Sequence, residues 1–186
     1  MNITVYCGAN LGNRQDYTHH AIALGKWIAQ HHQLIYGGGK VGLMGILADT
    51  VLENGGKVIG VIPEFLVERE LAHEHLSEIH IVKNMHERKA KMISLGNAYI
   101  ALPGGPGTLE EISEVISWSR IGQHHNPCIF YNETGYFNSL KHFFENMISE
   151  GFLSTKDYNS ILFATSIQDI ETFIQNYTPP QIRQYH

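Results

Sequence analysis

The feature that most constrains the fold is the alternation of two kinds of segment along the chain. Short apolar runs rich in β-branched and aromatic residues are separated by longer segments whose apolar residues recur at helical spacing. The runs cover residues 3–7, 33–36, 57–62, 78–82, 98–103, 128–131 and 160–164. Such alternation is typical of parallel βαβ units, whose crossovers place helices on both faces of the sheet. The sequence therefore predicts an α/β fold with one Rossmann-like, doubly wound and mainly parallel sheet.

Two of the helical segments carry clear apolar stripes, which we interpret as faces packed on the sheet. The stripes are formed by Tyr17, Ala21, Leu24 and Ile28 and by Phe137, Leu140, Phe144 and Met147. With 186 residues, of which 43% are hydrophobic, the chain is long enough for one sizeable core. We expect one nucleotide-binding domain over residues 1–175 and a C-terminal tail over residues 176–186, where Pro179 and Pro180 end the pattern.

The composition of the chain limits the kinds of molecule that we expect it to bind. No stretch approaches the roughly 20 apolar residues that span a bilayer, and no basic-then-apolar leader opens the chain, so we expect a cytoplasmic protein without membrane contact. The formal net charge of −5 gives no electrostatic reason to expect nucleic acid. Cys7 and Cys128 lie in or beside apolar runs, which predicts buried thiols rather than a disulfide or metal ligands. A small molecule is the expected ligand.

Glycine-rich stretches follow three of the predicted strands. They are CGANLG at 7–12, YGGGKVGLMG at 36–45 and LPGGPGTLEE at 102–111. Parallel strands present their carboxyl ends at one edge of the sheet, and ligands bind there. Glycine lets the backbone approach a ligand closely, and the start of a helix favours an anion. We therefore expect these stretches to share one phosphate-bearing ligand.

Other nucleotide and metal sites are less well supported. Residues 37–42 match G-x-G-x-x-G, but they follow the second run, and only Glu64 is a loose candidate for the acidic residue of an NAD site. A P-loop is unsupported because GxxxxGK[ST] does not occur. The histidines show no HExxH spacing, so we expect surface or loop positions, and no metal site, for the candidates His73, His75, His80, His124 and His125.

The stretch 102–118 permits two interpretations. Thr108 followed by Glu111 has the spacing of a capping box, which would make Glu111 structural. The glycines before it are not needed for a cap, however, and Glu110 with Glu111 would put negative charge beside a bound phosphate. Upstream, Arg88 and Lys89 enter early in the helix predicted from residue 84 onward. They form either a solvated basic face or a phosphate grip with two nitrogens of Arg88.

Two motifs of this chain resemble those of one family. PGGPGTLEE is similar to PGGxGTxxE, and MHERKAKM is similar to MHxRKxxM, of the LOG (lonely guy) family of cytokinin riboside 5'-monophosphate phosphoribohydrolases, formerly labelled lysine decarboxylases. CGAN, GGGKVGLMG and VIGVIPEFLVERE extend the resemblance over nearly the whole chain. It implies hydrolysis of the N-glycosidic bond of a nucleoside 5'-monophosphate (a cytokinin riboside 5'-monophosphate or AMP) to free base and ribose 5-phosphate, by a homodimer that uses no cofactor and no metal.

The resemblance also assigns residues. Arg88 and Glu111 would be catalytic. Substrate-binding positions would be Glu70, Arg88, Lys89, Gly104, Gly105, Pro106, Gly107, Thr108, Leu109, Glu110, Glu111, Ser117, Gly38, Gly39 and Met44. The family often has a hydroxyl residue in place of Ala9, an aromatic residue in place of Pro106 and threonine in place of Ser117, so the preferred base stays open.

The expected chemistry suits these residues. Cleavage of an N-ribosidic bond develops positive charge on the ribose, which the Glu111 carboxylate could stabilise, or it could activate the attacking water. Arg88 would fix the nucleotide or stabilise the departing base, and Glu70 would orient Arg88 or bind a ribose hydroxyl. A non-enzymatic nucleotide or cofactor carrier remains the alternative, although it would need the glycine loop and not the Glu111–Arg88 pair. No lysine is marked for a pyridoxal phosphate enzyme.

Overall fold

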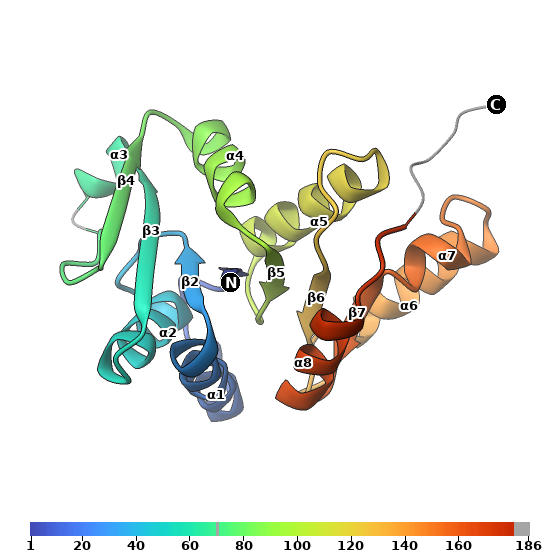
Figure 1. Ribbon diagram of the computed structural model, residues 1–186, viewed down its shortest axis with the longest axis horizontal. Helices are drawn as coiled ribbons and strands as arrows, with labels where there is room; N and C mark the ends of the chain where they lie inside the picture. The colour runs from blue at the N-terminus through green and yellow to red at the C-terminus, as the bar shows by residue number, and fades with distance from the viewer. Residues whose placement is uncertain (70, 181–186) are drawn as a thin grey trace.

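The computed structural model describes residues 1–69 and 71–180, and its centre is a seven-stranded parallel sheet (Figure 1). The strands are β1 (Asn2–Tyr6), β2 (Gln33–Tyr36), β3 (Lys57–Pro63), β4 (Glu78–Val82), β5 (Ala98–Ala101), β6 (Cys128–Tyr131) and β7 (Ile161–Ala164). Their order across the sheet is β4-β3-β2-β1-β5-β6-β7. All seven predicted runs are strands, which confirms the predicted fold class.

Helices cover both faces of this sheet, as Figure 1 shows. One face carries α1 (Gln15–His31), α2 (Gly42–Glu53) and α8 (Ile167–Asn176), and the other carries α4 (Met85–Leu95), α5 (Pro106–Arg120) and α6 (Asn138–Ser149). Two short helices complete the described elements, α3 (Glu64–Val67) and α7 (Thr155–Tyr158). No helix of the described residues is both long and apolar enough to cross a bilayer.

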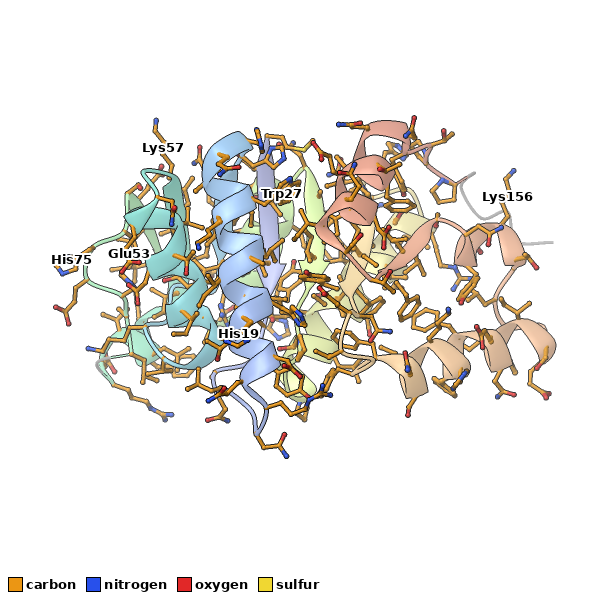
Figure 2. All side chains as sticks on the ribbon, turned by 90° about the horizontal axis from the view of Figure 1, so that it is seen from below. His19, Trp27, Glu53, Lys57, His75 and Lys156 are labelled. Carbon is orange, nitrogen blue, oxygen red and sulfur yellow. The ribbon has the colours of Figure 1, made fainter. Side chains whose placement is uncertain are left out.

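The strands hold the two layers together because alternate side chains enter opposite cores. In β1, Ile3 and Val5 pack towards α1 and α2, whereas Tyr6 packs towards α4 and α5. Each such aliphatic side chain contributes about 1.5–3 kcal/mol when fully buried. Side chains fill the space between helices and sheet, and charged groups such as Lys57 and Lys156 project outward at the surface (Figure 2).

Both predicted helical stripes belong to these cores. The α1 stripe is buried in the first core, and the stripe of residues 137–147 lies in or against the second. Cys7 and Cys128 are free and buried, as predicted. Helix α8 ends at Asn176, where the tail is predicted to begin, and residues 181–186 of that tail lie outside the described residues.

The site is positioned by the reversal of strand order between β1 and β5. These neighbours pair in parallel, with Thr4 opposite Tyr99, but β1 leads to α1 on one face and β5 leads to α5 on the other. The loops that follow them therefore separate and leave a crevice at the carboxyl end of the sheet. The Gly8 N–H donates to Pro103 O at 3.1 Å, and the Leu43 N–H donates to Gly8 O at 3.1 Å. These bonds bring the three glycine-rich stretches together.

Candidate active site

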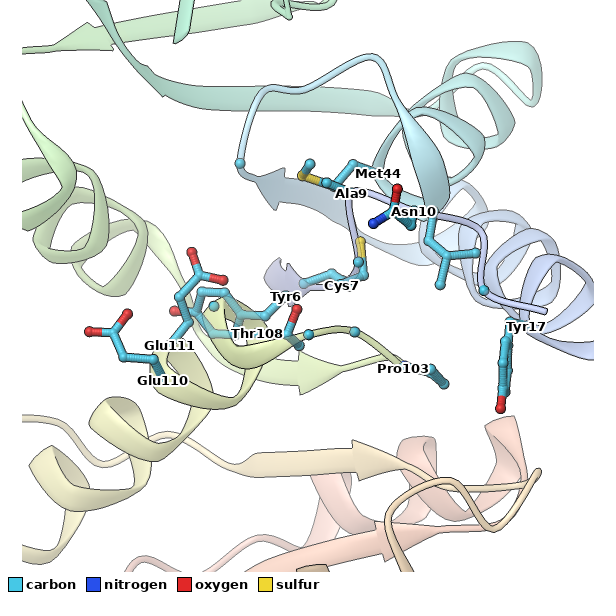
Figure 3. Close-up of a pocket in the computed structure, with 18 of the residues that line it drawn as sticks. Tyr6, Cys7, Ala9, Asn10, Tyr17, Met44, Pro103, Thr108, Glu110 and Glu111 are labelled. Atoms are coloured by element: carbon cyan, nitrogen blue, oxygen red, sulfur yellow. The ribbon is translucent and has the colours of Figure 1, made fainter. Parts of the chain in front are cut away.

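A cavity of about 380 Å³ opens at this reversal point. Its walls come from the loops that follow β1, β2, β5 and β6 and from the starts of α2, α4 and α5. The volume lies within the range of roughly 300–1,000 Å³ that is typical of small-molecule sites. In Figure 3, Thr108 and Glu111 on α5 lie on one side of the cavity, and Cys7 and Met44 lie on the other.

Helix α5 begins earlier than the predicted capping box requires. Gly105 is its N-cap and Pro106 its first residue, and no side chain caps the helix. Proline favours this first position because its φ is already helical and its missing N–H would have no partner there. Thr108 and Glu111 therefore both lie inside the helix, so the capping box is wrong. Glu111 has no capping role and is available for the cavity.

The glycine loop forms a concave surface of backbone at the start of α5. A Cβ at Gly105 or Gly107 would meet no atom within 4 Å, so both residues face open space. Gly104, by contrast, is closely packed, and a Cβ there would overlap Thr108 Oγ1. The first N–H groups of a helix have no intrahelical acceptor and carry the positive end of the helix dipole. This loop has the room and the polarity for a phosphate group.

Arg88 extends from α4 into the same cavity. Asn84 caps α4 by accepting from the Glu87 N–H, which places Arg88 early in the helix. Arg88 Nε donates to Val61 O at 3.1 Å, and Nη2 donates to Gly37 O at 3.2 Å. Gly37 must lack a side chain here, because a Cβ would overlap Nη2. The guanidinium is thus held by two backbone carbonyls, and the solvated basic face is excluded for Arg88 and Lys89, which are both buried.

Glu111 lies beside Arg88 in this cavity. Arg88 Nη1 is 3.7 Å from Glu111 Oε1, and each side chain is 10% exposed. Burial raises the pKa of Glu111, and the neighbouring Arg88 opposes part of that rise. Glu111 Oε1 is also buried without a hydrogen-bond partner among the described residues. The carboxylate is therefore more basic than an exposed glutamate, and its Oε1, nearest Arg88, accepts no hydrogen bond from the described residues.

The other predicted site residues fall into three groups. Met44, Gly104, Gly105, Gly107, Thr108 and Glu110 line the cavity together with Arg88 and Glu111. Gly38, Gly39, Lys89, Pro106, Leu109 and Ser117 are not among the lining residues. Glu70 lies outside the described residues. Ser117 is exposed on α5, and the place predicted for Gly38 and Gly39 is taken by Gly37.

Lys89 serves the packing of α4 against α5. Its ammonium forms ion pairs with Glu110 and, at 3.2 Å, with Glu114. The hydrogen bond to Glu110 raises the pKa of Lys89. Both partners lie on α5, so Lys89 ties the helix that carries Arg88 to the helix that carries Glu111.

Several lining residues were not predicted, among them Tyr6, Met85 and Tyr136, whereas Cys7 begins the stretch 7–12 that was expected at the ligand. Tyr6 and Cys7 end the apolar run 3–7, whose pattern indicates ordinary core positions. Burial raises the pKa of the Cys7 thiol, which keeps it neutral. The position of Tyr136 in the sequence could have identified it as a residue of the site. It lies just after β6, at the same carboxyl edge of the sheet as the glycine loops.

The histidine candidates are structural where the structure shows their partners. His73 is buried with Nε2 2.9 Å from Asp49 Oδ1, and His124 Nε2 lies 2.7 Å from Val115 O. His73 therefore lies in a loop, as expected, but is buried rather than at the surface, and its imidazole ties this loop to α2. Within residues 1–69 and 71–180, no group of three His, Cys, Asp or Glu side chains is placed to hold a metal ion.

The fold and cavity define a Rossmann-like α/β protein with a phosphate-sized glycine cradle and a buried carboxylate–guanidinium pair at the strand-order reversal. The family model described as "Possible lysine decarboxylase" matches residues 44–174. A cytokinin riboside 5'-monophosphate phosphoribohydrolase of Arabidopsis thaliana is 42% identical over 95% of this chain and 84% of its own length. One from Rhodococcoides fascians is 44% identical over 90% of this chain and 85% of its own. The chain belongs to this family, the LOG family.

A solved structure of similar fold comes from a more distant protein. The molybdenum cofactor carrier protein of Chlamydomonas reinhardtii superposes with a TM-score of 0.72, covers 94% of this chain and 95% of its own, and is 19% identical in sequence. At that identity the likeness establishes the shared fold and nothing about the ligand.

Proposed function

We propose that the protein is a phosphoribohydrolase that cleaves the N-glycosidic bond of a nucleoside 5'-monophosphate, a cytokinin riboside 5'-monophosphate or AMP, to free base and ribose 5-phosphate. The observation that carries the proposal is the buried pair of Glu111 and Arg88, 3.7 Å apart in one cavity beside the glycine loop. The names of the relatives, which extend over most of both chains, support the same reaction.

In the proposed reaction, water replaces the base at the anomeric carbon of the ribose. The bond between that carbon and the base nitrogen breaks, and its electron pair leaves with the base. Positive charge develops on the ribose ring, so the Glu111 carboxylate stabilises the transition state and accepts a proton from the attacking water. Its raised pKa makes it a better proton acceptor than an exposed carboxylate. The proton that the base needs comes from solvent or from the protonated Glu111.

Arg88 assists this step through one nitrogen. Nε and Nη2 donate to Val61 O and Gly37 O, and Nη1, which also donates to Met85 Sδ at 3.7 Å, is the nitrogen that faces Glu111. Because the guanidinium is already held, it provides a fixed positive charge that needs no rearrangement during the reaction. It orients the carboxylate and stabilises negative charge on the departing base.

The 5'-phosphate would bind at the glycine loop. The N–H groups of Gly107 and Thr108 belong to the first turn of α5 and are free of intrahelical acceptors. Holding the phosphate there fixes the ribose relative to Glu111, which lies one helical turn further along α5. We make two further proposals, a homodimer, which rests on the family resemblance, and a cytoplasmic location. Sedimentation and cell fractionation test them.

Two other activities are less well supported. A lysine decarboxylase with pyridoxal phosphate would require a lysine at the site, but no lysine lines the cavity among the described residues, and Lys89 is paired with Glu110 and Glu114. A carrier would need no general base, and a buried glutamate without a hydrogen-bond partner is an unfavourable feature to keep for binding alone.

Turnover of AMP and N6-isopentenyl AMP tests the proposal. The protein is incubated with each nucleotide, and released base is measured by chromatography. Glu111→Gln should lower the rate of base release by about 100-fold to 10,000-fold, the usual contribution of a general acid–base group. Glu53→Gln, an exposed glutamate at the end of α2, is the matched control and should leave the rate unchanged.

The binding of AMP to both variants completes the experiment. Nucleotide binding without base release by the unaltered protein would contradict the proposal and favour a carrier. Base release that persists undiminished in Glu111→Gln would contradict the role of Glu111.

A further inference from the structure

Tyr136 projects from the loop between β6 and α6, which is held by several hydrogen bonds. The buried Asn132 organises this loop, because its backbone N–H donates to Ala164 O at 2.7 Å and its Oδ1 accepts from the Phe137 N–H at 2.7 Å. Gly135 turns the chain with a φ of 75°. The Tyr136 ring is held edge-on against the rings of Tyr17, at 5.7 Å, and Phe137, at 5.0 Å. The ring therefore has a fixed place at the cavity wall.

The hydroxyl of Tyr136 reaches the glycine loop. It donates to Gly104 O at 2.6 Å, across 32 residues of sequence. The preceding carbonyl of the loop, Pro103 O, accepts from the Gly8 N–H at 3.1 Å. Two successive carbonyl groups of the loop are thus held by partners from other loops, one from after β1 and one from after β6.

This contact controls which backbone groups the loop offers to a ligand. Because the peptide bond is planar and trans, fixing the Gly104 carbonyl also fixes the N–H of Gly105, which points in the opposite direction. A free carbonyl oxygen in the loop would repel a phosphate, and the Tyr136 hydroxyl covers the oxygen of Gly104. Gly104 has no side chain to restrain this peptide otherwise, and Gly105 faces open space.

We propose that Tyr136 is a positioning residue for the phosphate group of the ligand. Its hydroxyl holds the Gly104–Gly105 peptide with the carbonyl oxygen masked and the orientation of the amide fixed. This inference rests on the proposed function only in placing a phosphate at the glycine loop, and it is independent of whether the bond to the base is cleaved.

Tyr136→Phe removes the hydroxyl and keeps the ring that packs on Tyr17 and Phe137. The matched control is Tyr158→Phe, which removes a hydroxyl that donates to Glu145 Oε1 at 3.2 Å, away from the cavity. Calorimetry measures the affinities of both variants and the unaltered protein for AMP, ribose 5-phosphate and adenosine. Thermal unfolding measures their stability.

Tyr136→Phe should weaken the binding of AMP and ribose 5-phosphate by about fivefold, the size expected for one hydrogen bond, and should leave the affinity for adenosine unchanged. Tyr158→Phe should change none of these affinities. A purely structural role would weaken the binding of all three ligands alike, and that result would overturn the inference.

Unchanged affinity of Tyr136→Phe for both phosphate-bearing ligands would also overturn it, as would failure of the unaltered protein to bind either of them. If the unaltered protein binds AMP but releases no base, the proposed hydrolase activity fails, and the comparison of the three ligands still decides the role of Tyr136.

Discussion

Replacing Gly37 by alanine tests whether the position of Arg88 depends on the backbone that surrounds it. An added Cβ would overlap Arg88 Nη2 and would lie 2.9 Å from Cζ, so the guanidinium must move. Both of its bonds to carbonyl oxygens, to Gly37 O and to Val61 O, would be lost or lengthened. Gly37 itself does not have a positive φ, so the substitution acts through this overlap and adds no backbone strain.

The cost can be divided between stability and activity. Each hydrogen bond from a charged donor contributes about 1.5–3 kcal/mol, so the loss of both sets an upper limit of about 3–6 kcal/mol. The displaced group is the far end of a flexible side chain beside an open cavity, where water replaces part of what is lost. We therefore expect the free energy of unfolding to fall by only about 1–2 kcal/mol. Activity should fall further, by about 100-fold in kcat, as when one fixed stabilising donor is removed from an active site.

The pH dependence provides a second readout. Arg88 lowers the pKa of Glu111 against the larger effect of burial. When the guanidinium moves away, the pKa of Glu111 should rise further, and the acid limb of the rate profile should move to higher pH.

The assay measures base release from AMP between pH 4 and pH 8, together with urea unfolding. Gly55→Ala is the control, because Gly55 has a φ of 77° and no neighbouring atom within 4 Å of an added Cβ. It destabilises the protein through backbone strain and leaves the cavity intact. If Gly37→Ala retained kcat within about twofold and kept its acid limb in place, the reasoning about Arg88 would be refuted.

Two further predictions concern Glu111 and the glycine loop. Because burial raises the pKa of Glu111 in the folded state, its ionisation opposes folding at neutral pH. Glu111→Gln should therefore unfold at a higher temperature than the unaltered protein at pH 7, and this advantage should disappear below about pH 4, where the carboxyl is protonated in both states. An equal or lower unfolding temperature of Glu111→Gln at pH 7 would contradict the conclusion that ionised Glu111 opposes folding. Gly105→Ala should fold normally, since its Cβ meets nothing within 4 Å. It should weaken the binding of ribose 5-phosphate at least tenfold and leave the affinity for adenosine unchanged. If calorimetry showed equal changes in the affinities for ribose 5-phosphate and adenosine, the phosphate would not bind at Gly105.

Local pattern was sufficient to predict the sheet. The apolar runs that become β2, β4 and β6 are bounded as predicted, because such runs have few other ways to be buried. The start of α5 was misjudged because the spacing of Thr108 and Glu111 fits a cap, whereas Pro106 begins the helix one turn earlier. That error matters for function, since it had kept a structural role open for Glu111.

The local pattern of apolar and polar residues did not predict contacts between positions far apart in the sequence. The bond from Arg88 to Gly37 joins positions 51 residues apart, and that from Tyr136 to Gly104 joins positions 32 apart. Nothing in the local sequence around either partner indicates the other. The resemblance to family motifs made Arg88 and Glu111 candidates, but only the three-dimensional arrangement shows how each is held. Burial of His73 against Asp49 was missed for the same reason.

The dependence of Arg88 on main-chain oxygens of β3 and of the turn after β2 has a consequence for redesign. Substituting neighbouring side chains does not remove a carbonyl group, so the anchor of the guanidinium survives changes that keep the strand register and leave Gly37 in place. Lining side chains from other elements, such as Tyr17 of α1, can then be varied separately. A library that varies such positions alone would change the shape of the cavity while the guanidinium stays where it is.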